Sequence, residues 1–169
     1  TGRWAAAAAA WRETRARFPE NPGVTFAYAE CLERLGDLAE AESVLREVLR
    51  REPDNPTALN FLGYLFANHG LRLEEAVTLV QRALSFDPDN GAYLDSLGWA
   101  YFRLARYEEA RRLLERAVVL TGGDPVIHDH LGDVYKALKL NELARDQYRL
   151  SVAAGSRDPG VRTKLDGLR

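Results

Sequence analysis

Small residues return at a fixed interval along this chain. The alanines that keep this interval, 34 or 35 residues apart, are Ala7, Ala41, Ala76, Ala110 and Ala144. Glycines and prolines at the same interval are Gly63, Gly98 and Gly132, and Pro19, Pro53 and Pro88. A period of this length is typical of a chain that repeats one supersecondary unit. Each unit then buries its apolar face against its neighbours, so the chain needs no single central core.

Apolar residues inside each unit predict two helices joined by a tight turn. In the third unit, Tyr93, Leu97 and Leu104 are spaced to lie on one helical face. The turn at residues 105–106 follows, and Ala110 opens the apolar face of a second helix. We therefore expect an all-α solenoid of antiparallel helix pairs, with about ten helices.

The expected units form one continuous solenoid domain. They are residues 1–20, the second helix of a truncated repeat; 21–55, 56–90, 91–124 and 125–157, four full repeats; and 158–169, the start of a further or capping helix. Residues 1–4 align with the turn before that first helix, and Trp4, Ala7 and Trp11 are expected to face inward. The turn at residues 70–73 carries one extra residue, which accounts for the single interval of 35 between the alanines.

The repeated glycines fall in the middle of the first helix of their units. Glycine there costs roughly 1 kcal/mol relative to alanine, so something must offset that cost. We expect the backbone of the second helix, at the repeated alanine, to come too close for a side chain. All seven prolines lie at unit boundaries, where they end one helix before Asp or Asn caps the next.

Composition excludes several classes of function. A net charge of −2 does not fit a nucleic-acid-binding surface, which usually shows clustered basic excess. No apolar run approaches 18 residues, so no direct membrane insertion is expected. Cys31 is the only cysteine, which rules out an intrachain disulfide. The chain has no methionine, so we expect it to be a fragment of a longer protein.

The residues that recur at this interval also form a pattern that resembles a known family of repeats. They are Leu62, Gly63, Phe66, Ala76, Ala83 and Pro88 in unit two; Leu97, Gly98, Tyr101, Ala110, Leu114 and Ala117 in unit three; and Leu131, Gly132, Tyr135, Ala144 and Tyr148 in unit four. This pattern resembles the tetratricopeptide repeat. Units three and four depart from it at Gly122 and Ser156, where proline is expected. The resemblance implies a right-handed superhelix whose first helices line a concave surface.

A second resemblance is to bacterial envelope scaffolds of this family. It is carried by residues 59–64 and 94–99, and by a composition with only three lysines among 23 basic residues. It favours a bacterial protein of the periplasm or envelope, with the cytoplasm as the alternative location.

The concave surface implied by the resemblance is the candidate binding site. Its residues, left over after helix packing, are Phe26, Glu30, Arg34, Asn60, Tyr64, Asn68, Asp95, Trp99, Arg103, Asp129 and Asp133. Large aromatics beside hydrogen-bonding groups are typical of binding hot spots. An alternative is that Tyr64 and Trp99 stack on each other and only stiffen the array.

Chaperone-binding members of the family hold a peptide carboxylate with paired Lys and Asn. Here only Asn60 is of the right type and the corresponding positions carry no lysine. Because Glu30, Glu33 and Asp95 make the inner face acidic, we expect a basic or mixed-polarity ligand.

No catalytic or metal-binding constellation is evident. His128 and His130 are two residues apart on a helix, so they point in different directions and cannot share an ion well. The serines lack a glycine elbow, and the glycines form no phosphate loop. We therefore expect no enzyme activity and no cofactor.

Three functions remain open. The first is a scaffold that binds a peptide or partner protein in the concave groove. The second is a self-assembling module that forms a homodimer or larger stack through exposed repeat ends. The third is a non-catalytic adaptor arm of a larger enzyme or envelope complex.

Overall fold

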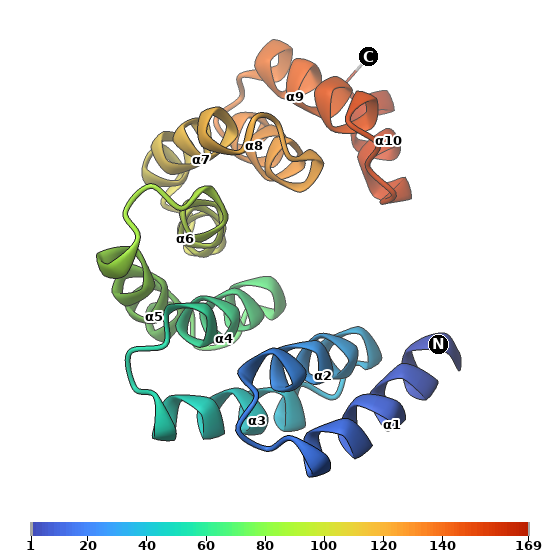
Figure 1. The fold of residues 1–169 in the computed structure, drawn as a ribbon. Coiled ribbons are helices and arrows are strands. Elements are labelled where there is room, and N and C mark those ends of the chain that lie inside the picture. The colour runs from blue at the N-terminus through green and yellow to red at the C-terminus, as the bar shows by residue number, and fades with distance from the viewer. Residues whose placement is uncertain (1, 169) are drawn as a thin grey trace.

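The computed structural model describes residues 2–168, which fold into ten α-helices arranged as an arc (Figure 1). The helices are α1 (Gly2–Arg17), α2 (Pro22–Leu35), α3 (Leu38–Arg51), α4 (Pro56–His69), α5 (Leu73–Phe86), α6 (Gly91–Arg103), α7 (Tyr107–Thr121), α8 (Pro125–Ala137), α9 (Asn141–Ala153) and α10 (Pro159–Asp166). The even-numbered helices line the inside of the arc and the odd-numbered helices cover its outside. The all-α solenoid is thus confirmed. Our division of the chain into repeat units stays a proposal.

Helix starts and ends follow the local sequence. The Asn21, Asn55 and Asn90 side chains each accept a hydrogen bond from a backbone N–H in the first turn of the following helix. Such caps satisfy donors that have no partner inside the helix. The turns between paired helices use a left-handed residue, which is glycine in two units and Ala105 or Lys139 in the others.

The turn with one extra residue has its own conformation. Gly70 has a φ of +67°, and Arg72 two residues later is also left-handed, with a φ of +40°. The extra residue therefore stays in the turn, and the helices on both sides keep the register of the other units.

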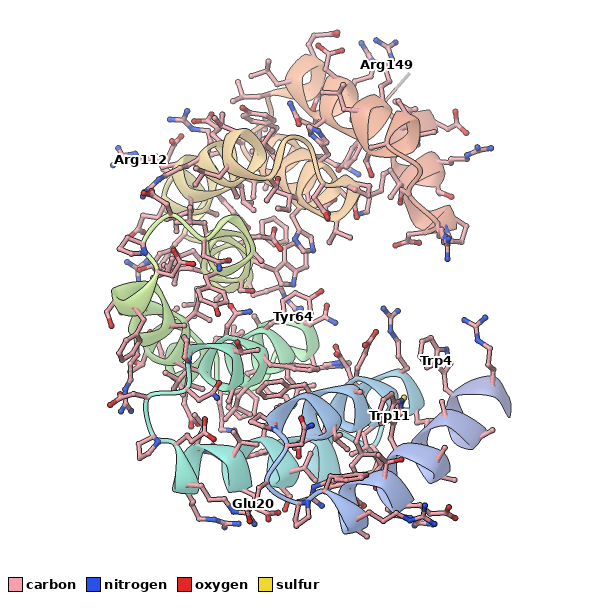
Figure 2. All side chains as sticks on the ribbon, in the orientation of Figure 1. Trp4, Trp11, Glu20, Tyr64, Arg112 and Arg149 are labelled. Carbon is pink, nitrogen blue, oxygen red and sulfur yellow. The ribbon has the colours of Figure 1, made fainter. Side chains whose placement is uncertain are left out.

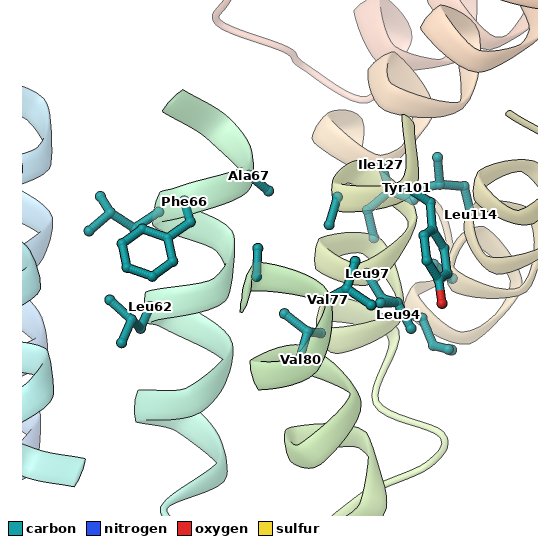
Figure 3. Packing of buried hydrophobic residues seen from close by; sticks show 14 of the residues in the cluster. Leu62, Phe66, Ala67, Val77, Val80, Leu94, Leu97, Tyr101, Leu114 and Ile127 are labelled. Carbon is teal, nitrogen blue, oxygen red and sulfur yellow. The ribbon is translucent and has the colours of Figure 1, made fainter. Parts of the chain in front are cut away.

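Buried side chains form one continuous cluster that runs between the helices from Ala8 to Val161. Figure 3 shows its middle, where Leu62 and Phe66 of α4 and Leu97 and Tyr101 of α6 fill the spaces between layers. Each layer is therefore held by its neighbours and not by a central core.

The repeated glycines lie where the two helices of a unit come closest together. A Cβ at Gly98 would lie 2.7 Å from Leu114 Cγ, and one at Gly132 would lie 2.4 Å from Tyr148 Cε1. The carbonyl oxygen of Ala110 lies farther from the Gly98 position, at 3.4 Å. The expectation of close packing is confirmed, but a side chain of the second helix, rather than its backbone, sets the limit.

Aromatic residues three positions after these glycines link each unit to the one before. The three contacts are the Tyr135 hydroxyl donating to Glu115 at 2.9 Å, the Gln81 amide donating to the Tyr101 hydroxyl at 3.1 Å, and the Arg46 guanidinium lying 5.7 Å from the ring centre of Phe66. Equivalent positions make the contact each time, so the stacking of layers repeats along the arc.

The N-terminal end corrects two expectations. Gly2, Arg3 and Trp4 are helical and not a turn, while Thr1 lies outside the described residues. Trp11 is 36% exposed, and Ala8 is the buried residue of α1. α1 packs against α2, and its Arg15 pairs with Glu47 of α3, while Ala5, Ala6, Ala9 and Ala10 are exposed. None of the described helices is both long and apolar enough to cross a membrane.

Candidate functional site

The inner face of the arc holds a cavity of about 780 Å³. Its walls come from α2, α4, α6 and α8 and, at the C-terminal end, from α10 and residues 155–158 before it. Figure 2 shows Tyr64 of α4 pointing into this hollow. Six of the eleven predicted residues line the cavity: Arg34, Tyr64, Asn68, Trp99, Asp129 and Asp133.

Trp99 belongs to a stack of rings across two units. Its ring lies 4.8 Å from that of Phe102 and 4.1 Å from that of His130, with interplanar angles of 16° and 14°. The alternative in which Trp99 stacks on Tyr64 is therefore wrong. Among residues 2–168, the buried Trp99 Nε1 has no hydrogen-bond partner. Trp99 thus joins two units through its stack on His130, and it also forms part of the cavity wall.

His130 is a buried histidine that pairs with a buried carboxylate. Its Nδ1 lies 2.8 Å from Asp95 Oδ1, and both residues are less than a tenth exposed. Burial opposes the charged imidazolium, but the nearby carboxylates of Asp95, Asp129 and Asp133 raise the pKa of His130 above its ordinary value. Asp95 therefore holds His130, which lines the cavity, and does not line the cavity itself.

Asp129 and Asp133 share one cation. Lys164 Nζ of α10 donates to Asp129 Oδ1 at 2.8 Å and to Asp133 Oδ2 at 2.7 Å. The Tyr148 hydroxyl donates to the other Asp133 oxygen at 2.8 Å. Burial raises the pKa of Asp129, against the effect of Lys164. The two carboxylates of α8 are thus engaged within the protein, by Lys164 and Tyr148.

Arg103 also makes structural contacts, in its case with the end of α4. Its Nη1 donates to the backbone oxygens of Ala67 and Asn68, at 2.8 Å and 2.6 Å. A cation there complements the negative end of the α4 dipole. The Asn68 amide in turn donates to Glu33 at 3.1 Å, which ties α4 to α2.

Tyr64 keeps a free hydroxyl at the cavity. Burial, with the nearby carboxylates of Asp95 and Glu33, raises the pKa of Tyr64 to about 12. The phenol is therefore neutral at physiological pH, and no hydrogen bond engages it within residues 2–168. It can donate or accept a hydrogen bond from a bound molecule.

The remaining predicted residues do not line the cavity. Phe26 contacts Phe61 with ring centres 6.4 Å apart. Asn60 is half-buried, and its buried Oδ1 has no hydrogen-bond partner in the part of the chain that the structure describes. Glu30 is exposed on α2 but is not part of the cavity wall.

Sequence reasoning missed the C-terminal wall. Arg157 and Lys164 both line the cavity. Lys164 lies 35 residues after Asp129, so continuing the repeat period would have found it. Arg157 lies in the loop before α10 and keeps no such register, so the period gives no signal for it.

The two histidines of α8 make separate contacts. His128 Nδ1 lies 2.7 Å from the side-chain oxygen of Gln147, whereas His130 faces Asp95. Within residues 2–168, no group of three or more histidine, cysteine or acidic side chains is placed to hold a metal ion.

Comparison with known families decides the identity of the fold. Three models described as tetratricopeptide repeat match residues 1–63, 39–91 and 91–124. The chain belongs to the tetratricopeptide repeat family. Tetratricopeptide repeat proteins generally mediate protein–protein interaction and are generally non-catalytic scaffolds.

Individual relatives agree with this assignment. The TPR repeat-containing protein PA4667 of Pseudomonas aeruginosa is 39% identical over 87 residues, which are 52% of this chain and 15% of that protein. The chain thus spans only a small part of this curated relative. The thermophilic tetratricopeptide repeat protein TTC0263 of Thermus thermophilus has a TM-score of 0.86 at 20% identity, covering 99% of this chain and 91% of that one. Cut9–Hcn1 of the APC/C has a TM-score of 0.87 at 17% identity, covering 99% and 33%. Both structures share the fold.

Proposed function

We propose that this chain is a non-catalytic scaffold that binds a peptide or a segment of a partner protein in its concave groove. The cavity carries the proposal, because helices from four units and from the C-terminal end all contribute to its walls. A segment bound there would contact units that are far apart in the sequence.

The side chains of the wall support this role. Tyr64 and Trp99 offer large, rigid surfaces, and aromatic residues are enriched among those that dominate binding energy. The Trp99 ring loses little conformational freedom on binding, because it is already fixed by its stack. The carboxylates of the wall are held by structural hydrogen bonds, which suits recognition better than proton transfer.

An affinity capture from cells of the encoding organism tests the proposal. We expect proteins retained by the wild-type chain to be lost with Tyr64→Ala/Trp99→Ala and with Tyr64→Lys, which places a charge in the groove while leaving the Trp99 stack intact. The helical circular dichroism of each variant must match the wild type. Val119→Lys is the matched control, because Val119 is 78% exposed on α7, outside the cavity. Equal retention by all variants would contradict a role for the groove.

A second candidate is self-assembly through the N-terminal end. The outer face of α1 exposes four alanines beside Trp11, namely Ala5, Ala6, Ala9 and Ala10. An unpaired apolar helix face of this kind favours contact with another copy. Trp11→Glu should then shift a concentration-dependent oligomer to monomer, whereas Tyr64→Lys should leave the oligomer unchanged.

A further inference from the structure

Two arginines at opposite ends of the groove have no carboxylate partner. Arg34 lies near the end of α2 and Arg157 in the loop before α10, and both line the same cavity. Both are exposed, and neither makes a hydrogen bond or ion pair within residues 2–168. A guanidinium carries five N–H donors and no acceptor, so both residues present donors that a bound molecule can use.

Arg34 also lies over an aromatic ring. Its guanidinium lies 5.5 Å from the ring centre of Trp4, a distance at which the ring attracts the cation. Stacking on an aromatic face leaves the N–H groups at the guanidinium edge free to bind a carboxylate. Figure 2 shows Trp4 on the open side of the arc, next to the groove.

The carboxylates of the cavity wall are already engaged. Asp129 and Asp133 share Lys164, and Asp158 accepts the backbone N–H of Gly160 at 2.8 Å to cap α10. Arg34 and Arg157 are therefore the charged groups of the wall that no hydrogen bond or ion pair engages within residues 2–168. The two free guanidinium groups favour an acidic ligand, where the sequence alone suggests a basic or mixed-polarity one.

We propose that the groove recognises an acidic segment of a partner protein, whose carboxylates pair with Arg34 and Arg157 while an apolar or aromatic side chain packs on Tyr64 and Trp99. The inference rests on the proposed function and adds the chemistry of the partner. Paired guanidinium–carboxylate contacts fix orientation as well as adding affinity. The two arginines lie on separate walls of the cavity, so one acidic segment that reaches both would span the groove.

A random peptide display library tests this proposal, with the full chain as the target. Peptides selected on the wild type are sequenced and then measured against Arg34→Ser/Arg157→Ser. The matched control is Arg112→Ser/Arg149→Ser, which removes two arginines that point away from the groove (Figure 2). A third variant, Tyr64→Lys, reports whether a peptide binds in the groove at all.

We expect the selected peptides to be enriched in Asp and Glu and to lose about tenfold or more in affinity with Arg34→Ser/Arg157→Ser. The control should change affinity little, and added salt should weaken the wild-type complex. Peptides that depend on Tyr64 but are basic, or that ignore the two arginines, would overturn the acidic partner and leave the groove function standing. Peptides that ignore Tyr64 as well would overturn both.

Discussion

His130 and Asp95 form an ion pair that joins two layers of the solenoid at 2.8 Å. The two residues are 35 apart in the sequence, so they occupy neighbouring positions in consecutive repeats. The imidazole also stacks on Trp99, which forms part of the groove wall. The His130–Asp95 pair therefore joins two layers and also positions the Trp99 ring, which we assign to binding.

Removing His130 should destabilise the array strongly. His130→Ala leaves Asp95 buried without its partner, and breaking one side of a buried pair costs roughly 3 kcal/mol. Urea unfolding of His130→Ala, Asp95→Ala and the double variant Asp95→Ala/His130→Ala measures this effect. If the double variant loses as much as the two single variants added together, the two residues are not coupled and the pairing account fails.

The same pair should make stability depend on pH. Neighbouring carboxylates raise the pKa of His130 in the folded state above its unfolded value, so folding is favoured by protonation. The stabilisation is fully present below the unfolded pKa of about 6.5, and it is lost as pH rises through the higher folded value. We expect the difference in unfolding free energy between wild type and His130→Gln to shrink as pH rises from acidic to alkaline. A difference that grows over this range would refute the assigned charge state.

The glycine in the middle of α6 should tolerate no side chain. A Cβ at Gly98 would lie 2.7 Å from Leu114 Cγ, so Gly98→Ala should cost about 1–3 kcal/mol and Gly98→Leu more. In a chain of this size each kcal/mol lowers the melting temperature by about 2–4 °C. Gly2→Ala is the control, because a Cβ there meets nothing within 4 Å. Thermal melts of all three variants check this, and equal midpoints would remove the packing explanation.

The turn before α7 should be improved by glycine. Ala105 adopts a left-handed φ of +58°, which strains an L-residue, whereas the equivalent Gly36 adopts +82° without that cost. Ala105→Gly should therefore gain roughly 0.5–1 kcal/mol after the entropy of glycine in the unfolded chain is counted. Gly36→Ala should lose a similar amount of stability, because alanine is strained at this φ. Nothing within 4 Å would contact the new side chain, so the backbone strain is the whole effect. Urea unfolding of both variants would show opposite signs, and a shared sign would contradict the strain account.

Much of the fold follows from the sequence because packing repeats. The period places Gly98 against Leu114 and Ala110 by the same rule that places Gly63 against Val80 and Ala76. The N-terminal end departs from this repeating pattern of burial. Trp11 occupies an inward position of the period, yet it is 36% exposed in the structure.

The candidate site was less predictable, because the period assigns positions and not partners. It placed Asp95, Asp129 and Asp133 on the inner face. It brings His130 near Asp95 and Lys164 near Asp129, but it does not show that these side chains pair or that Lys164 bridges Asp129 and Asp133. These contacts depend on long side chains that reach from one layer to the next. As a result, the sequence suggested an acidic surface, whereas Arg34 and Arg157 at the cavity have no ion-pair partner among the described residues 2–168.

Photo-crosslinking from inside the groove tests the central claim most directly. Tyr64 is replaced by p-benzoylphenylalanine in the protein produced in cells of its own organism, and Val119 on the outer helix α7 is replaced in a parallel variant. Our account predicts that the residue at position 64 cross-links to a partner protein while the one at position 119 does not. Adducts from position 119 alone, or none from position 64, would contradict binding in the concave groove.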